Sequence, residues 1–120
     1  MTGKRVLIVD DDHDICVNLK DILDDLGYVA DTACDSTSAL RLVSAGTYDV
    51  ALLDYHIPGM NGVDLHQEIV KNLPQIASIM MTAYAHDFGC EHAKDGGIRQ
   101  VLRKPVDIVE LLSLVKKFSN

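Results

Sequence analysis

One apolar run that ends in a carboxylate constrains the fold of this chain more than any other feature. Residues 50–53 read Val-Ala-Leu-Leu with no polar residue at alternate positions, and Asp54 follows them directly. An apolar run without alternation is typical of a strand that is buried on both faces in a parallel sheet. Open α/β sheets bind ligands beyond the carboxyl ends of such strands. Asp54 is therefore predicted to lie at a ligand site, and the turn residues of segment 58–62 predict a loop behind it.

The rest of the chain alternates between strand patterns and helix patterns. Apolar runs at residues 4–9, 28–32, 76–81 and 98–102 predict four more strands. Helical signals follow each strand, in segments that begin near residues 12, 35, 61, 86 and 107. The segment 86–96 has few apolar anchors, so only a short helix is expected there. Strict alternation of five strands with five helical segments predicts an α/β domain with a parallel sheet and right-handed crossovers.

Local signals predict where the helices begin and which faces they bury. Helix caps are expected at Asp12 or His13, at Asp35 or Ser36, at Asn61 and at Asp107. Gly27 is expected to end the first helix. His66, in the third helix, is expected at the surface. The last helix is expected to pack through an apolar stripe made of Ile108, Leu111, Leu112 and Val115.

Composition excludes several classes of protein. The chain has 120 residues, 48% of them hydrophobic, which fits one domain over residues 1–120. Its apolar runs are far shorter than the roughly 18 residues that span a bilayer, and no secretory signal opens the chain, so no membrane contact and a cytoplasmic location are expected. The net charge of −7 argues against direct binding of nucleic acid. The basic residues near the end are interpreted as a solvated face: Arg99, Arg103, Lys104, Lys116 and Lys117.

The three cysteines do not form a recognisable framework. Cys16, Cys34 and Cys90 are odd in number and contain no Cys-x-x-Cys spacing. A structural disulfide set or a thiolate zinc site is therefore not expected, and the thiols are predicted to be reduced. His86 and Cys90, with His92 nearby, could be drawn as a metal site, but further ligands are lacking and this interpretation is not favoured.

Five polar residues stand at or just beyond the carboxyl ends of predicted strands: Asp10, Asp11, Asp54, Thr82 and Lys104. Because parallel strands end at the same edge of a sheet, these side chains should converge on one crevice. Carboxylates held together repel each other unless a cation neutralises them. Oxygen ligands of this kind suit Mg²⁺, which typically binds one or two carboxylates together with phosphate oxygens. A lysine and a hydroxyl are the partners that a phosphoryl group requires.

These positions resemble the receiver domain of two-component response regulators. The motifs that carry the resemblance are Val-Asp10-Asp11, Leu-Leu-Asp54 with Pro58-Gly-Met-Asn-Gly62, Met-Thr82-Ala83 and Lys104-Pro105, and they are spread over the whole chain in the order of that family. The resemblance implies a doubly wound, flavodoxin-like (βα)₅ fold, with five parallel strands in the order 2-1-3-4-5 and five helices. It also implies a cis bond before Pro105.

The resemblance implies a phospho-acceptor that is not an enzyme in the usual sense, since it catalyses only its own phosphorylation and dephosphorylation. Asp54 would accept a phosphoryl group from a phosphohistidine on a sensor histidine kinase or a histidine phosphotransfer protein. Asp11 would bind Mg²⁺ directly and Asp10 largely through water, together with Asp54 and the backbone carbonyl of His56. Thr82 would donate a hydrogen bond to the phosphoryl group.

Lys104 would pair with the same group, and the new charge would switch the surface made of the fourth helix, fifth strand and fifth helix. A downstream effector domain or protein would bind that surface. Whether phosphorylation also produces a homodimer is left open. Val101 stands where the family usually has a rotating Tyr, Phe or His, so the usual coupling of such a residue to Thr82 is not implied. His56 and Tyr84 flank the site and are expected to slow hydrolysis of the phosphoryl group by restricting water.

Two other functions fit part of the sequence. A phosphatase of the haloacid dehalogenase type would use Asp10 as nucleophile and Asp12 as general acid, but it gives the segment from Asp54 to Gly62 no role. A receiver-like interaction domain that is no longer phosphorylated is not favoured, because the acceptor set is intact. The sequence leaves open the cognate kinase, the output, and whether the chain acts alone or within a longer regulator or hybrid kinase.

Overall fold

Five parallel strands form the sheet on which the chain is built. The structure is a computed structural model that describes residues 3–83 and 92–119. The strands of this sheet are β1 (Arg5–Val9), β2 (Val29–Ala33), β3 (Val50–Asp54), β6 (Ala77–Thr82) and β7 (Gln100–Arg103). They are hydrogen-bonded in the order β2-β1-β3-β6-β7, and every pair is parallel. Counted within this sheet the order is 2-1-3-4-5, which confirms the predicted fold class.

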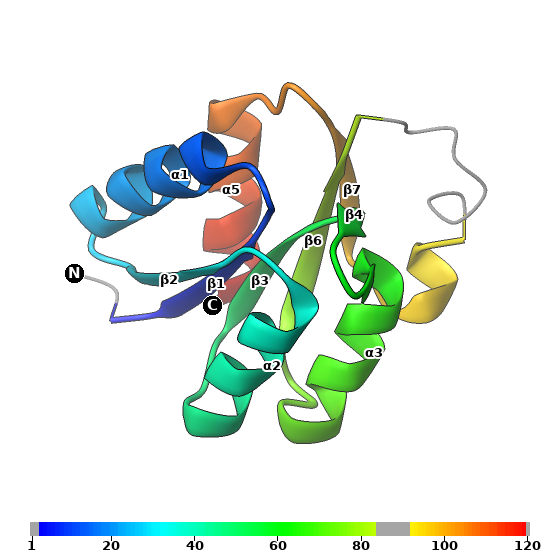
Figure 1. The fold of residues 1–120 in the computed structure, drawn as a ribbon. Coiled ribbons are helices and arrows are strands. Elements are labelled where there is room, and N and C mark those ends of the chain that lie inside the picture. Colours follow the sequence, from blue (N-terminus) through cyan, green and yellow to red (C-terminus); the bar gives the residue numbers. More distant parts are fainter. Residues whose placement is uncertain (1–2, 84–91, 120) are drawn as a thin grey trace.

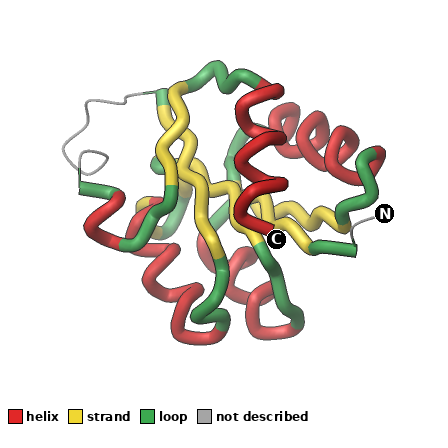
Figure 2. Tube along the Cα trace, turned by 180° about the vertical axis from the view of Figure 1, so that it is seen from behind, coloured by secondary structure: helices red, strands yellow, loops and turns green. Residues whose placement is uncertain are grey.

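The helices lie in two layers, one on each face of the sheet (Figure 1). α1 (His13–Asp25) and α5 (Ile108–Ser119) cover one face, and α2 (Ser36–Ala45) and α3 (Gly62–Asn72) cover the other. Figure 2 shows the first pair from behind, with the C-terminal helix in front of the strands. Both central strands, β3 and β6, are buried along their whole length, as the apolar run before Asp54 predicts. None of the described helices is long and apolar enough to cross a membrane.

Capping side chains hold three helices close to the carboxyl ends of the strands. The Asp12 carboxylate accepts hydrogen bonds from the first turn of α1, Asp35 accepts one from Ser38 N at 2.7 Å, and Asn61 accepts one from Asp64 N at 2.8 Å. These are the predicted caps. Only three residues separate β1 from the start of α1, and the third of them, Asp12, is already the helix cap, which holds Asp10 and Asp11 at the sheet edge.

The predicted loop after Asp54 contains a small antiparallel hairpin. Its strands are β4 (His56–Ile57) and β5 (Met60–Asn61), and Gly59 lies between them with a φ of 106°. The Pro58 carbonyl in the same turn accepts a hydrogen bond of 3.0 Å from Ser36 N. The hairpin is therefore hydrogen-bonded to the start of α2.

The fourth predicted helix is described only in part. Residues 86–91 of that segment lie outside the described residues, so the metal-site interpretation at His86 and Cys90, which is not favoured, stays untested. In the described part a single 3₁₀ helix, η1 (Lys94–Gly96), precedes Gly97, which has a φ of 99°. A Cβ at Gly96 would lie 2.7 Å from Val63 Cγ1 of α3. The glycines thus let this turn pack closely on α3.

Two expectations about burial were wrong. His66 was expected at the surface, yet only 4% of it is exposed, and its Nδ1 lies 2.6 Å from Ser78 Oγ of β6. It is buried because β6 and the turn after η1 both pack against this part of α3. Ile108 was expected to pack in the core but is 36% exposed, whereas Leu111 and Val115 are fully buried. Ile108, in the first turn of α5, lines an open groove toward α1, so its side chain is only partly covered.

The buried histidine predicts a stability change in mild acid. Burial lowers the pKa of His66, and the charge of Arg99 lowers it further, so the folded protein holds His66 neutral. The unfolded chain takes up this proton near about pH 6.5, so the free energy of unfolding should fall as the pH drops below that value. The slope should approach about 1.4 kcal/mol per pH unit at most. Urea unfolding between about pH 7 and 5 measures it.

His66→Asn is the matched variant, since the Asn amide can replace Nδ1 toward Ser78 but does not titrate. In His66→Asn, the free energy of unfolding should fall less steeply as the pH drops from about 7 to 5 than it does in the wild type. Equal slopes in the wild type and in His66→Asn would contradict the prediction.

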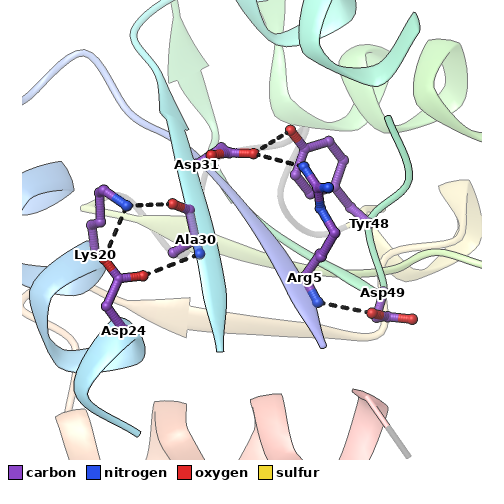
Figure 3. Close-up of polar contacts among 7 residues, drawn as sticks. All are labelled: Arg5, Lys20, Asp24, Ala30, Asp31, Tyr48 and Asp49. Carbon is purple, nitrogen blue, oxygen red and sulfur yellow. Dashed lines mark hydrogen bonds and ion pairs between the residues drawn. The ribbon is translucent and has the colours of Figure 1, made fainter. Parts of the chain in front are cut away.

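Polar contacts between neighbouring strands stabilise the other end of the sheet (Figure 3). An Arg5 Nη of β1 donates to Asp31 Oδ2 of β2 at 3.1 Å, and the Tyr48 hydroxyl donates to the same oxygen at 2.7 Å. The Asp49 carboxylate accepts from Arg5 N at 2.9 Å. The start of β1, the middle of β2 and the segment that leads into β3 are therefore joined, away from the predicted ligand site.

The outer edge of β2 is protected by α1. Lys20 Nζ donates to the Ala30 carbonyl at 2.7 Å, and Ala30 N donates to Asp24 Oδ1 at 3.3 Å (Figure 3). Lys20 and Asp24 also form an ion pair of 2.9 Å. These side chains satisfy backbone groups that a further strand would otherwise pair with.

Candidate functional site

Three carboxylates meet at the carboxyl edge of the central strands. Asp10 and Asp11 follow β1, and Asp54 ends β3, the next strand in the sheet. Oxygens of all three carboxylates lie within 4.8 Å of one another. Asp10 is fully buried and Asp54 is 6% exposed, whereas Asp11 is open to solvent. The structure thus brings together the three acidic residues that the sequence predicts.

Lys104 neutralises part of this negative charge. Its Nζ lies 2.7 Å from Asp10 Oδ2 and 3.4 Å from Asp54 Oδ2. The Lys104 N–H donates to the Thr82 carbonyl at 2.8 Å, which fixes the residue after the end of β7. The bond to Pro105 is cis, as the family resemblance implies. Lys104 is therefore a partly buried counter-ion at this site, and it does not belong to a solvated basic face.

Burial and charge shift the ionisation of the site in opposite directions. Burial raises the pKa of Asp54, the Asp10 carboxylate raises it further, and Lys104 and the His56 N–H oppose that change. For Lys104, burial alone lowers the pKa, but the hydrogen bond to Asp10 and the charges of both carboxylates outweigh it and raise the pKa. The ammonium group is therefore held in its charged form beside two anions.

Asp10 is fixed by hydrogen bonds on three sides. Its Oδ1 accepts from Asp12 N at 2.9 Å, its N–H donates to the Ala33 carbonyl at 3.1 Å, and its carbonyl accepts from Cys16 Sγ at 3.2 Å. Burial and the charge of Asp10 raise the pKa of the Cys16 thiol to about 11, so the thiol keeps the proton that it donates. Sequence reasoning missed the contact with Cys16. The only signal was its position one turn into the predicted helix.

Thr82 and His56 lie beside the acidic residues. Thr82 ends β6 next to β3 and is fully buried. The His56 N–H donates to the Asp54 carboxylate, while the His56 side chain is exposed, with its ring centroid 4.7 Å from that of Tyr55. The expected roles of Thr82 toward a phosphoryl group and of the His56 carbonyl toward a metal stay predictions. Tyr84 lies outside the described residues.

The donor set fits a hard divalent cation. Its three converging side chains offer only carboxylate oxygens, and the exposed Asp11 leaves one side open to solvent. Mg²⁺ and Ca²⁺ prefer such oxygen ligands, and Mg²⁺ keeps several water molecules when it binds to one or two carboxylates. With Lys104 present, a cation at this position would bring the charge of the crevice close to neutral, which favours binding of a further anion such as a phosphoryl group.

An apolar groove lies next to the acidic site. It has a volume of about 440 Å³ between α1 and the connection from β7 to α5. Ile15 and Leu19 of α1 line one side, and Pro105, Val106 and Ile108 line the other. Lys104 belongs to both the groove and the acidic site. The half-exposed Ile108 therefore lies on a surface beside the site.

Comparisons with known proteins agree with this geometry. Residues 6–116 match the family model described as response regulator receiver domain. The chain is 33% identical to sporulation initiation phosphotransferase F of Bacillus subtilis, over 98% of this chain and 95% of that protein. It is 31% identical to the aerobic respiration control sensor protein ArcB of Escherichia coli, over 95% of this chain but only 15% of that protein.

Solved structures show the same likeness. A CheY-like response regulator receiver domain protein from Methanospirillum hungatei has a TM-score of 0.91 and 32% identity, covering 97% of this chain and 93% of that chain. The response regulator TrrA from Thermotoga maritima, in complex with Mg²⁺ and BeF, has a TM-score of 0.83 and 34% identity, covering 96% of this chain and 98% of that chain.

Proposed function

Because this chain belongs to the response regulator receiver domain family of two-component signalling, we propose that Asp54 accepts a phosphoryl group from a phosphohistidine. The donor would be a sensor histidine kinase or a histidine phosphotransfer protein. The observation that supports this most directly is the convergence of Asp54 with two further carboxylates and the Lys104 ammonium at one sheet edge.

The chemistry follows from these side chains. A carboxylate oxygen of Asp54 attacks phosphorus, a P–O bond forms, and the P–N bond to the donor imidazole breaks, which leaves an acyl phosphate on Asp54. Lys104, already 3.4 Å from Asp54 Oδ2, stabilises the negative oxygens of the group being transferred. The hydroxyl of Thr82 donates a hydrogen bond to the same group. The fold supplies position and charge, which are the main sources of rate in phosphoryl transfer.

Asp10, Asp11 and Asp54, with the His56 carbonyl, would hold Mg²⁺. When bound, the ion neutralises charge on the phosphoryl oxygens and orients them. The oxygen-only donor set supports this assignment, and the related TrrA structure contains Mg²⁺. Asp10 has its Oδ2 on Lys104 and its Oδ1 on Asp12 N, which supports contact with the ion through water.

The apolar groove beside Lys104 is the proposed docking place for the phosphodonor. A helix of the partner could lay apolar side chains against Ile15 and the Pro105-Val106 connection, which would bring its phosphohistidine to the neighbouring acidic site. On phosphorylation the surface near β7 and α5 would bind an effector domain or protein. Val101 lies partly buried against the core, at the position where the family usually has an aromatic switch residue. The usual aromatic switch would therefore not act on that surface. The proposed location is the cytoplasm.

Phosphorylation by a small donor tests this function. The purified protein is incubated with acetyl phosphate or phosphoramidate, with and without Mg²⁺, and its intact mass and peptides are measured. The expected result is a Mg²⁺-dependent gain of one phosphoryl group that maps to Asp54 and is absent in Asp54→Asn. An adduct on Asp10, or steady phosphate release without an adduct, would favour the phosphatase. If the protein forms no adduct and releases no phosphate, an interaction domain is indicated.

Removal of the flanking side chains should shorten the lifetime of the acyl phosphate. His56 is exposed next to Asp54, so its ring can cover one approach to the phosphoryl group, and Tyr84 is expected to cover another. The double variant His56→Ala with Tyr84→Ala should lose the phosphoryl adduct several-fold faster than the wild type. The decay is measured by intact mass at successive times after the phosphodonor is removed. His92→Ala is the control, since that exposed side chain pairs with Asp95 at 3.5 Å. An unchanged half-life in the double variant would refute the idea.

A further inference from the structure

Two thiols face one small pocket beside Asp10. The pocket has a volume of about 190 Å³ and lies between the β1–α1 loop and the segment that joins β2 to α2. Cys16 from α1 and Cys34 from that joining segment both line it, together with Asp10 and His13. The two cysteines thus border the same pocket although 17 residues separate them in the chain.

The two thiols differ in access. Cys34 is exposed, so a small oxidant in solution can reach it. Cys16 is only 5% exposed, so a molecule in bulk solvent meets it far less often. Both are free thiols in this structure. An exposed thiol that is oxidised first and a sheltered neighbour that reacts with it is the arrangement found in reversible thiol oxidation.

Both cysteines are also anchored to Asp10. Cys16 Sγ donates to the Asp10 carbonyl at 3.2 Å. The carbonyl of Ala33, the residue before Cys34, accepts a hydrogen bond of 3.1 Å from Asp10 N. Asp10, which is proposed to bind Mg²⁺, is therefore hydrogen-bonded both to the backbone next to Cys34 and to the sulfur of Cys16.

We propose that hydrogen peroxide converts Cys34 and Cys16 into a reversible disulfide, and that this bond weakens binding of a divalent cation at the acidic site. The second part rests on the proposed function. The first part does not.

The oxidation balances with peroxide as the only oxidant. The Cys34 sulfur attacks one peroxide oxygen, the O–O bond breaks, and the products are a sulfenic acid on Cys34 and one water. The Cys16 sulfur then attacks the Cys34 sulfur, the S–O bond breaks, and the hydroxide leaves with the Cys16 proton as a second water. The two thiols lose two electrons in total and peroxide gains two. A dithiol reductant reverses the bond by thiol–disulfide exchange.

Oxidation would change the surroundings of Asp10 directly. A disulfide sulfur has no proton, so Cys16 could no longer donate to the Asp10 carbonyl. The Cys16 sulfur would also have to move, because the two thiols are free in this structure and a disulfide holds its sulfurs about 2.05 Å apart. Loss of a hydrogen bond that orients a metal ligand typically lowers metal affinity by about tenfold or more. Here the loss would act on the Asp10 carboxylate through its backbone.

The experiment uses the full chain with Cys90→Ser, so that only the two thiols of the pocket remain. The protein is exposed to hydrogen peroxide and digested without reduction. A loss of two hydrogens in the intact mass, and a cross-linked peptide that contains Cys16 and Cys34, are expected. Both should disappear after dithiothreitol and should never form in Cys34→Ser. Circular dichroism confirms that each variant folds. Oxidation of Cys34 to sulfinic acid without a cross-link would overturn the proposal.

Calorimetric titration with Mg²⁺ tests the coupling. The oxidised protein should bind Mg²⁺ about tenfold more weakly than the reduced protein. Peroxide-treated Cys34→Ser should bind like the reduced protein. Equal affinities in a fully cross-linked sample would overturn the coupling. A reduced protein that binds no Mg²⁺ would overturn both the coupling and the proposed metal site, while the mass measurement would still decide whether the disulfide forms.

Discussion

Lys104→Met is expected to lower the free energy of unfolding by about 3 kcal/mol at neutral pH without divalent cations. The Lys104 side chain is 19% exposed, and it pairs with a fully buried Asp10 carboxylate and a largely buried Asp54. Methionine keeps most of the volume but removes the charge, so two buried anions lose their counter-ion. The raised pKa of Lys104 means that its ion pairs contribute fully at neutral pH and are lost only above its ordinary pKa of 10.5.

Urea unfolding with and without Mg²⁺ measures this loss. Burial and Asp10 already raise the pKa of Asp54, and removal of Lys104 should raise it further. The penalty should therefore shrink as the pH falls and Asp54 takes up a proton. Mg²⁺ should also reduce it by replacing the missing charge. Lys71→Met is the matched control, because that 69% exposed lysine forms only a surface pair with Glu68. A penalty that is independent of pH would contradict the explanation.

Gly62→Ala is expected to destabilise the protein by about 2 kcal/mol and to disturb the acidic site. A Cβ at Gly62 would lie 2.7 Å from the Asp54 carbonyl oxygen and 3.3 Å from Tyr55 Cα. Both are backbone atoms, so no side chain can rotate away. Either α3 must retreat from the sheet or the backbone at Asp54 must shift, and the second change would move a carboxylate of the site. Thermal unfolding and Mg²⁺ titration measure the two effects.

Gly46→Ala separates this clash from the general effect of replacing a glycine. A Cβ at Gly46 would meet its nearest neighbour, an Arg5 Nη, at 3.5 Å, which is an ordinary contact. Its φ of −157° suits any residue. The stability of Gly46→Ala should stay close to that of the wild type or exceed it. If Gly62→Ala were equally well tolerated and bound Mg²⁺ normally, close packing of α3 on the Asp54 backbone would not be a constraint on this site.

Much of the fold could be predicted because its signals are local. The apolar run before Asp54 fills a strand that is buried on both faces, and the caps at Asp12, Asp35 and Asn61 begin the helices as expected. Periodicity and capping depend on residues within one or two turns, so they can be read from one sequence. The order of the strands came from the family resemblance, since no local signal carries it.

Burial along the helices could not be predicted so well. His66 and Ile108 both lie on amphipathic helices, yet His66 is buried against Ser78 and Ile108 is 36% exposed in the groove beside α1. A helical pattern states which residues share a face. How deeply that face is covered depends on what packs against it, here β6 and the turn at Gly97 for His66.

The sequence by itself determined that Asp10, Asp54 and Lys104 would meet, because parallel strands all present their carboxyl ends at one edge of the sheet. Only the tertiary structure decided how they meet. Lys104 lies closer to Asp10 than to Asp54, the Cys16 thiol supports the Asp10 backbone, and Gly62 lets α3 pack against the Asp54 backbone. Topology brings residues to an edge within several ångströms. The final contacts depend on the packing of α1, α3 and the β7–α5 connection over that edge, and no local pattern records it.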